Sequence, residues 1–437
     1  MSASRAVEVE VEGAGRGGSK PVGPQCYSDL LPGQKVPQDS GSDPSKPPEW
    51  LDSAVYDPEQ MKAFFDEHLI SFTFIWHCSL VFGLCIESFL KPLIFTGQSA
   101  TVALSLQRYM HTFAHLIEWH ESDIFDPSSA SYASVAQVRA LHGGVAKAMD
   151  ASMPGVTWIS SYDMACVQTG FVGVVCTVAD KFGMIASDEE LTRYVNFWRC
   201  VARQLGLADK WNLCGSGHDV AANIVYELVQ RVLVPNNQHP PPERELLMKN
   251  FIGFENEMCL PTTARSTVAF VYWAFGYDLP EMGLLDWALF YAMRLFAALT
   301  RRSRLARRVC GCAVRASLRK RLAALRLEAA LQTEGAQGAA AGGCPYGAAE
   351  AAARGVCPMK PVASPEASAA AGKRRHAVFG RPCSPLGLLL WLGLWLLPIG
   401  VALLVLGVFG GLGSLLGSDS AGRSTALQWM PLRVDAS

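Results

Sequence analysis

The chain has 437 residues, half of them hydrophobic, and its formal net charge is −1 at pH 7. This balance provides no overall positive field, so it argues against a nucleic-acid partner, and the high hydrophobic content favours contact with a membrane. The 13 cysteines are scattered, with no CxxC pair and no zinc-ligand spacing. They therefore indicate free thiols in a reducing compartment rather than a disulfide framework.

The first segment and the domain that follows differ sharply in composition. Residues 1–48 are rich in Gly, Ser and Pro and lack apolar periodicity, so we expect them to be disordered; they also lack the apolar core of a secretory signal. Residues 49–276 are dense in apolar and aromatic side chains and carry helix-start signals at Asp57 and Ser187. No series of short alternating segments joined by hairpin turns is present, so the predicted fold class is all-α.

Two apolar stretches resemble membrane helices in composition. Leu69–Ile86 is long enough to span a bilayer, but it contains His77 and is followed by Glu87. We expect a core helix there, with a membrane span as the alternative. Leu284–Leu299, in the segment 277–326, is too short to span comfortably and predicts a packed or interfacial helix.

A basic run without an intervening acid completes the segment 277–326. Its members are Arg301, Arg302, Arg304, Arg307, Arg308, Arg315, Arg319, Lys320 and Arg321. Two interpretations stay open. The run either binds the anionic headgroups of membrane lipids, which would make the segment membrane-interfacial, or forms a solvated basic helix.

The C-terminal part carries the strongest physical signal in the sequence. Residues 327–384, rich in Ala and Gly, have the composition of a flexible linker. Residues 385–417 are the predicted transmembrane anchor, because Leu386–Phe409 is almost purely apolar and uncharged over the length that a helix needs to cross a bilayer. A short polar tail, 418–437, follows. More Lys and Arg precede the anchor than follow it, so the positive-inside rule places the folded domain in the cytosol.

Candidate functional side chains lie on two consecutive predicted helices. On the first, Thr101–Trp119, apolar residues recur at steps of four and three and define a buried face. The opposite side carries Arg108, His111, Thr112 and His115. This side is either a solvated face or, through its two histidines, part of a metal site, although the glutamate of an HExxH motif is missing at Thr112.

The second helix, 134–149, places a histidine inside its apolar stripe. The stripe consists of Val135, Val138, His142, Val145 and Met149. A buried imidazole must be hydrogen-bonded or bind a ligand, because leaving it unsatisfied costs about 1–3 kcal/mol. Both a core histidine bonded to a neighbour and a metal ligand fit the pattern. A haem iron held from one side by such a histidine would leave its opposite side open for dioxygen.

A series of short motifs runs through the helical domain. In chain order they are Phe95-Thr96-Gly97, Arg108-x3-Thr112, Val138-Arg139-x2-His142, Tyr162-Asp163-Met164, Phe171, Gly183 through Leu191, Phe197-Trp198-Arg199 and Leu205 through Asp209. Their order and spacing resemble the rubber oxygenase (latex-clearing protein) and ER-bound MpaB oxygenase superfamily over roughly residues 55–260. The separation between Arg108 and His142 agrees with that family's pattern.

This resemblance implies a globin-like helical domain that holds haem b, with His142 as the proximal iron ligand. It implies that Arg108 and Thr112 shape the haem environment and act in catalysis, with His111 beside them. A guanidinium could pair with a haem propionate or polarise bound oxygen, and Thr112 could donate a hydrogen bond. Asp163 would have a structural or pocket role.

Two departures from the rubber enzymes bear on the substrate. Those enzymes have a lysine where this chain has His111, and their upstream glutamate base has no counterpart here, Glu87 being the nearest acid. We therefore do not expect rubber cleavage. The resemblance to MpaB and the predicted anchor together favour a lipid-like, isoprenoid substrate and the membrane of the endoplasmic reticulum.

These observations predict a membrane-anchored haem oxygenase, an oxidoreductase that uses dioxygen to oxidise or cleave a carbon–carbon double bond of an apolar substrate. Two alternatives remain. One is a non-haem metal oxygenase that uses His111, His115 and His120. The other is a non-catalytic, membrane-tethered binding module whose basic segment and apolar helices engage lipids or a partner.

Overall fold

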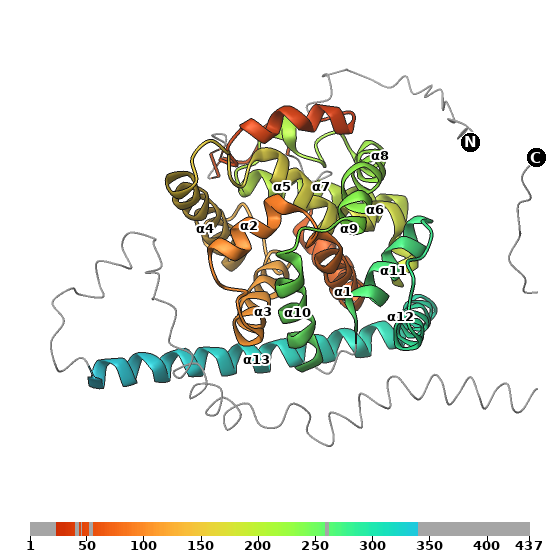
Figure 1. Cartoon of the computed structure of the whole chain (residues 1–437). Coiled ribbons are helices and arrows are strands. Elements are labelled where there is room, and N and C mark those ends of the chain that lie inside the picture. The colour runs from red at the N-terminus through yellow and green to blue at the C-terminus, as the bar shows by residue number, and fades with distance from the viewer. Residues whose placement is uncertain (1–22, 40–42, 45, 52–55, 258–261, 340–437) are drawn as a thin grey trace, which may run out of the picture. The chain divides into compact units, whose positions relative to one another are not determined.

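The computed structural model describes residues 23–39, 43–44, 46–51, 56–257 and 262–339 (Figure 1). The chain divides into two units, residues 1–379 and 380–437, and all of the second lies outside the described residues. The predicted anchor and polar tail therefore lie outside them too, as does the predicted linker from residue 340 onwards.

The described residues confirm the all-α prediction, because they form no strand beyond a single bridge between Pro37 and Ser160. The α-helices are α1 (Pro58–Gly83), α2 (Glu87–Phe95), α3 (Val102–Glu118), α4 (Ala130–Ser152), α5 (Ser161–Gln168), α6 (Val174–Val178), α7 (Asp188–Gln204), α8 (His218–Leu228), α9 (Val234–Gln238), α10 (Arg244–Glu257), α11 (Ala264–Phe275), α12 (Leu284–Arg302) and α13 (Arg304–Ala339). Shorter helical turns are η1 (Tyr27–Lys35), η2 (Thr169–Gly173), η3 (Ala179–Phe182), η4 (Asp209–Trp211) and η5 (Val229–Leu233), of which η2 and η5 are π-helical.

Local sequence signals determine where several helices begin. The Asp57 side chain caps α1 by accepting a hydrogen bond from the backbone N–H of Gln60 at 3.0 Å. Ser187 caps α7 and forms a reciprocal capping box with Glu190. Both helices begin where the sequence predicts, because a side-chain oxygen satisfies a backbone N–H that has no partner within the helix.

Helix α1 is the central element of the hydrophobic core. Phe65 and Phe72 of α1 are fully buried, and the helix packs against α7, α11 and α13. The imidazole of His120 stacks on Phe65 and meets Phe197 at a tilt, with ring centroids 4.0 and 4.5 Å away. This burial supports the core-helix interpretation of Leu69–Ile86, a stretch that ends in the break between α1 and α2.

Membrane-compatible helices are few in the described part of the chain. The helical stretch Ser161–Phe182 is long and apolar enough to cross a bilayer, but 78% of its apolar window is buried inside the protein. The pair α1 and α2 passes the same test as a span bent by 96°. Buried core helices share this length and composition. The predicted C-terminal anchor is not among the residues that this test covers.

Part of the N-terminal segment folds onto the domain, so the expectation of disorder over 1–48 does not hold for residues 23–39. Residues Tyr27–Lys35 form η1, which packs against α5, and Leu30 of η1 is fully buried in the main core. Composition did not predict this contact because one buried leucine and a few hydrogen bonds hold a segment that is otherwise polar.

Helix α12 packs closely on the turn that follows η3. Gly183 has a left-handed backbone with φ of 81°, and a Cβ atom at this position would lie 2.8 Å from the carbonyl oxygen of Ala297. Only glycine suits both the conformation and the close approach. The glycine that opens one of the resembling motifs therefore positions α12.

Arginines of α13 pair with acidic residues of α1. Three of them have a side-chain nitrogen 3.0–3.3 Å from the Glu67 carboxylate: Arg304, Arg307 and Arg308. Further along the helix, Arg315 pairs with Asp66. The basic run is therefore divided: some of its cations bind the protein itself, which neither open interpretation anticipated. Helix α13 also extends to Ala339, past the predicted start of the flexible linker at residue 327.

Candidate functional site

Two neighbouring helices, α3 and α4, carry the predicted site residues, and α2 packs against α4 (Figure 1). The hydroxyl of Thr101 caps α3 and that of Ser129 caps α4, each by accepting the backbone N–H three residues on. Helix α3 therefore begins as predicted. Helix α4 begins and ends several residues beyond the predicted range 134–149.

A cluster of polar side chains joins α3 to α4. Nε1 of Trp119 donates to Oγ of Ser134 at 3.0 Å, and Nδ1 of His115 lies 2.8 Å from the same oxygen. Because an indole can only donate, the Ser134 hydroxyl accepts from Trp119 and is free to donate to His115. Burial, followed by the charge of His111, lowers the pKa of His115. His115 is thus a neutral, structural histidine whose Nδ1 is already bonded.

Arg108 lies on α3 where this helix meets the end of α2. Its Nη1 donates to Oγ1 of Thr96 at 3.4 Å, and that hydroxyl donates to the carbonyl oxygen of Pro92 at 3.0 Å. Burial lowers the pKa of Arg108, yet a guanidinium remains charged at neutral pH. Within the described part of the chain, no carboxylate forms an ion pair with it. An enclosed cation without a counter-ion is unfavourable, so this position suits an anionic group of a ligand.

His142 lies on α4 and is half-buried. Its Nδ1 atom is enclosed and has no hydrogen-bond partner among the described residues. Burial, and then the charge of nearby Arg108, lowers the pKa of His142 to about 4. The imidazole is therefore neutral at pH 7 and keeps a lone pair, which is the form that binds metals. Nδ1 of His68 and Nε2 of His120 likewise have no partner among the described residues, so both interpretations of His142 stay open.

The other two predicted site residues lie on the exposed side of α3. Thr112 donates its hydroxyl to the carbonyl oxygen of Arg108 at 3.1 Å, a bond within the helix, and His111 is exposed. Among the predicted site residues, Arg108 and His142 are therefore the two that interact: the charge of Arg108 lowers the pKa of His142. Glu87, the acid nearest in sequence, is exposed and pairs with Lys91 at 2.6 Å.

Several other motif residues hold the fold together. Asp163 completes the cap of α5, where its Oδ2 accepts from the backbone N–H of Ser160 at 2.9 Å, in line with the structural role expected for it. Arg199 pairs with Asp209 at 3.2 Å and stacks over the ring of Trp50 at 3.7 Å. These contacts explain why such residue types occupy those positions without any part in chemistry.

Sequence reasoning missed a buried ionisable pair between α1 and α10. Nδ1 of His77 contacts the carboxylate of Glu255, and Nε2 of His77 lies 3.3 Å from Oγ1 of Thr267. Burial raises the pKa of Glu255, and the neighbouring His77 opposes that shift. No local signal could have revealed the pair, because its members are 178 residues apart in the chain.

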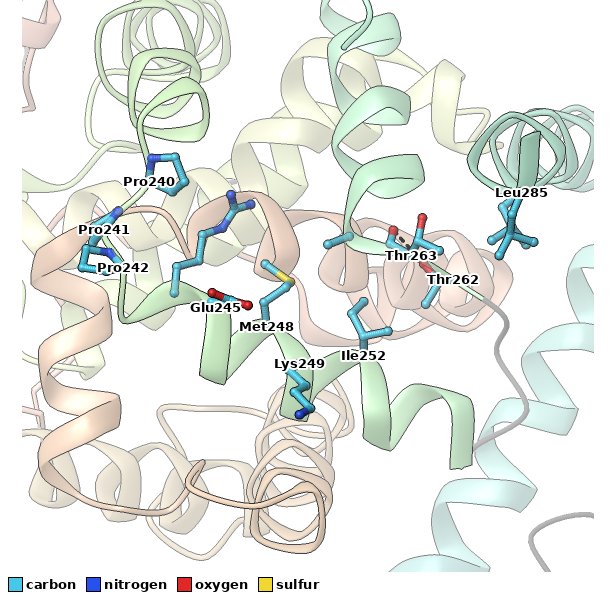
Figure 2. A pocket seen from close by; sticks show the side chains of 13 residues that line it. Pro240, Pro241, Pro242, Glu245, Met248, Lys249, Ile252, Thr262, Thr263 and Leu285 are labelled. Carbon is cyan, nitrogen blue, oxygen red and sulfur yellow. Dashed lines mark hydrogen bonds between the residues drawn. The ribbon is translucent and has the colours of Figure 1, made fainter. Parts of the chain in front are cut away.

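Two cavities lie away from His142. The first, of about 740 Å³, is lined by α10, α12 and the start of α11; in Figure 2, Met248 and Ile252 rise from α10 toward Thr262 and Thr263. The second, of about 780 Å³, borders the C-terminal part of α12, from Tyr291 to Arg302. Neither is lined by the predicted site residues Arg108, Thr112 and His142.

A multi-ligand metal site of the non-haem kind is not formed by the described residues. They contain no group of three or more His, Cys, Asp or Glu side chains arranged to hold a metal. His120 is stacked in the core and donates Nδ1–H to the carbonyl oxygen of Leu116 at 2.7 Å, while His115 is bonded to Ser134. The set His111, His115 and His120 is therefore not brought together as the non-haem alternative requires.

A family model described as ER-bound oxygenase mpaB/B'/rubber oxygenase, catalytic domain, matches residues 72–331, which is more than half of the chain. The chain belongs to this family. No curated protein and no solved structure gives a significant match. For this MpaB/rubber-oxygenase protein, the matched region runs past residue 276, where the sequence placed the end of the catalytic domain. It includes α12 and most of α13, so both helices belong with the oxygenase domain.

The residues around His142 fit the haem b that the resemblance implies. An enclosed imidazole nitrogen without a partner suits a side chain that binds iron, and a half-buried guanidinium without a carboxylate among the described residues suits a propionate. Both features belong to the chain itself.

Proposed function

We propose that this member of the MpaB/rubber-oxygenase family is a haem-dependent, membrane-anchored oxygenase. It would use dioxygen to oxidise or cleave a carbon–carbon double bond of an apolar substrate of isoprenoid type. The single observation that carries the haem assignment is His142, a neutral, half-buried imidazole beside Arg108 whose Nδ1 has no partner among the described residues. The oxygenase class itself follows from the family.

The chain's own residues would bind and orient the cofactor. His142 would hold the iron, and its neutral state at pH 7 means that no proton must leave before binding. Arg108, oriented by its hydrogen bond to Thr96, would pair with a propionate. Bound haem would supply the iron that activates dioxygen. Thr112 and His111, on the exposed side of α3, would line the outer edge of the site, and Thr112 could donate to a ligand after releasing the Arg108 carbonyl.

The proposed substrate class rests on two positions at which this chain differs from the rubber enzymes. Glu87 is exposed and paired with Lys91, and His111 stands where the rubber enzymes have lysine. These two positions therefore supply neither the glutamate base nor the lysine that the rubber enzymes have. A membrane anchor at 385–417 would instead hold the domain at the cytosolic surface of the endoplasmic reticulum, where an isoprenoid lipid dissolves.

Visible absorption of the purified full-length protein tests the haem assignment. We expect a Soret band with one haem per chain, and its loss in His142→Ala. The matched control is His239→Ala, which removes an exposed histidine just after α9 and should keep the band. A colourless protein with stoichiometric transition metal would favour the non-haem alternative. A protein that binds neither, even after haem is added, would favour the non-catalytic binding module.

Two further measurements address the membrane and the substrate. A glycosylation tag placed after Phe409 should be modified if the tail is lumenal, and an unmodified tail would overturn the proposed orientation. Incubation of the haem-loaded protein with polyprenyl compounds under dioxygen should release shortened or oxygenated products. His142→Ala should release none.

A further inference from the structure

The outward face of α12 is apolar over most of its length and ends in a cation. Positions spaced by four and three residues are exposed: Leu284, Ala288, Tyr291, Leu295, Ala298 and Arg302. Leu284 is 91% exposed and Tyr291 is 55% exposed. The inward face, which includes Phe290 and Met293, packs into the core. An amphipathic helix of a soluble protein directs its polar side outward, so an apolar stripe on the outward side of α12 needs a separate explanation.

Helix α13 repeats the same arrangement immediately after α12. Its exposed positions at the same spacing are Leu305, Val309, Cys312, Ala316, Arg319 and Ala323. Leu305 is 72% exposed and Val309 is 54% exposed. The inward side is held by Arg307, Cys310 and Leu318, which are buried. We call these two exposed stripes together the α12–α13 face; Figure 1 shows both helices along one edge of the described part.

The charges that α12 and α13 themselves bring to the α12–α13 face are positive beyond Asp286 in the first turn of α12, while Asp180 of η3 borders the second cavity beside α12. The sequence contains no acid between Asp286 and Glu328. The exposed cations of the two helices are Arg301, Arg302, Arg304, Arg308, Arg319 and Lys320. Some of these reach acids of other elements, such as Arg301 with Asp180. Arg302, Arg319 and Lys320 form no ion pair with any described residue. The face therefore combines apolar stripes with positive charge that the protein does not neutralise.

The second cavity lies beside α12 and adds aromatic and cationic side chains to this surface. Its wall includes Trp273, Tyr291, Arg294 and Arg302. The Arg294 guanidinium lies 4.5 Å from the centre of the Trp273 ring. Aromatic rings and cations side by side are typical of protein surfaces at the depth of lipid headgroups, where rings contact the acyl boundary and cations meet phosphates.

We propose that the α12–α13 face lies flat against an anionic lipid bilayer. An anionic bilayer supplies both an apolar layer for the stripes and negative charge for the cations. A second copy of the chain would bring one cationic face against another, which like charges oppose. The chain's own apolar segment 386–409 carries no acid to neutralise the arginines. This contact requires neither the haem site nor the predicted anchor, so it can fail or hold independently of both.

Lipid-embedded quenchers test the contact in the full-length protein. An environment-sensitive fluorophore is attached to Cys312, which is naturally exposed, after Cys26, Cys259, Cys344, Cys357 and Cys383 are replaced by serine. The protein is reconstituted in vesicles of phosphatidylcholine with or without phosphatidylserine and with doxyl-labelled lipid. We expect several-fold stronger quenching when phosphatidylserine is present. The matched control carries the fluorophore at Val156→Cys, an exposed apolar position elsewhere, in a Cys312→Ser background, and should show little quenching.

Charge removal supplies the second arm. Arg302→Gln and Arg319→Gln should each lower the equilibrium constant for contact between the α12–α13 face and the anionic bilayer by about fivefold. This is the usual effect of one cation at an anionic surface. Absence of quenching at Cys312, or equal quenching without phosphatidylserine, would overturn the proposal. A fluorophore whose emission is blue-shifted but not quenched would also overturn it, because something other than lipid would then cover the face. If that blue shift depends on the protein concentration, a second copy of the chain covers the face. If it does not, the chain's own apolar segment covers it.

Discussion

Three histidines on α3, α4 and the turn between them have different chemistry because their neighbours differ. His115 shares the Ser134 hydroxyl with Trp119, and His120 packs against two phenylalanine rings. His142 has an enclosed nitrogen with no partner among the described residues. Nε2 of His120 also has no partner among the described residues, but His120 is fully buried among aromatic rings, whereas His142 is only half-buried.

His120 predicts an acid-sensitive fold. Burial lowers its pKa to about 3, below the ordinary value of about 6.5, so the unfolded chain binds the extra proton more readily than the native protein. The stabilising contribution is complete above about pH 6.5 and is lost as the pH falls toward 3. Urea unfolding of the full-length protein in mild detergent should show a free energy of unfolding that falls by about 1.4 kcal/mol per pH unit for this group.

The variant that isolates this effect is His120→Phe, which keeps a ring between Phe65 and Phe197. Its free energy of unfolding should depend less on pH between 6 and 5 than that of the unmodified protein. His68, whose pKa burial lowers to about 4, remains in both and leaves some pH dependence. Equal slopes for the two proteins would show that His120 is not buried as a neutral ring.

Sequence patterns could identify His142 but could not distinguish it from His120. Helical spacing places His142 within an apolar stripe, and this much is visible without a structure. The electrostatic effect of Arg108 on His142 and the stacking of His120 on Phe65 depend on which helices meet. No spacing within one helix encodes that information. The same reason hid His77 and Glu255, which are joined only by the packing of α1 against α10.

At the scale of elements, ion pairs fasten α13 to the core helix α1. Arg307 is 7% exposed, and its Nη2 lies 3.0 Å from the carboxylate of Glu67, which also accepts from Arg304 and Arg308. Helix α13 contains the basic side of the α12–α13 face, so these pairs also determine how that face is presented. Their buried member makes them stronger than the usual surface ion pair.

Glu67→Gln should therefore destabilise the protein markedly. The change leaves Arg307 enclosed without a carboxylate, so we expect the free energy of unfolding to fall by about 2–3 kcal/mol. The matched control is Lys91→Gln, which breaks the exposed pair with Glu87 on α2 and should cost less than about 0.5 kcal/mol. Denaturant unfolding followed by tryptophan fluorescence measures both. Similar small losses in the two variants would mean that α13 is not fastened by this cluster.

Element positions were predicted where the signal is local and missed where it is not. The caps at Asp57, Thr101 and Ser187 are short-range hydrogen bonds, so the starts of α1, α3 and α7 follow from the sequence. The end of α13 and the folding of η1 have no such signal. Both depend on partners far away in the chain or on the summed helix preference of many alanines and leucines.

At the scale of the whole molecule, the N-terminal segment completes the core of the oxygenase domain. Leu30 of η1 is fully buried in the main cluster, although the segment is separated in sequence from α1 and lies before the region that the family model matches. Leu30→Ala should lower the free energy of unfolding by about 2–4 kcal/mol, because it removes buried methyl groups and leaves a cavity. Its neighbour provides a close control: Leu31 is 38% exposed, and Leu31→Ala should cost only about 0.5 kcal/mol. Thermal and urea unfolding of the two variants, with the Soret band followed in parallel, would separate loss of stability from loss of haem. If both substitutions have the same small effect, η1 does not belong to the cooperative core, and the domain folds without it.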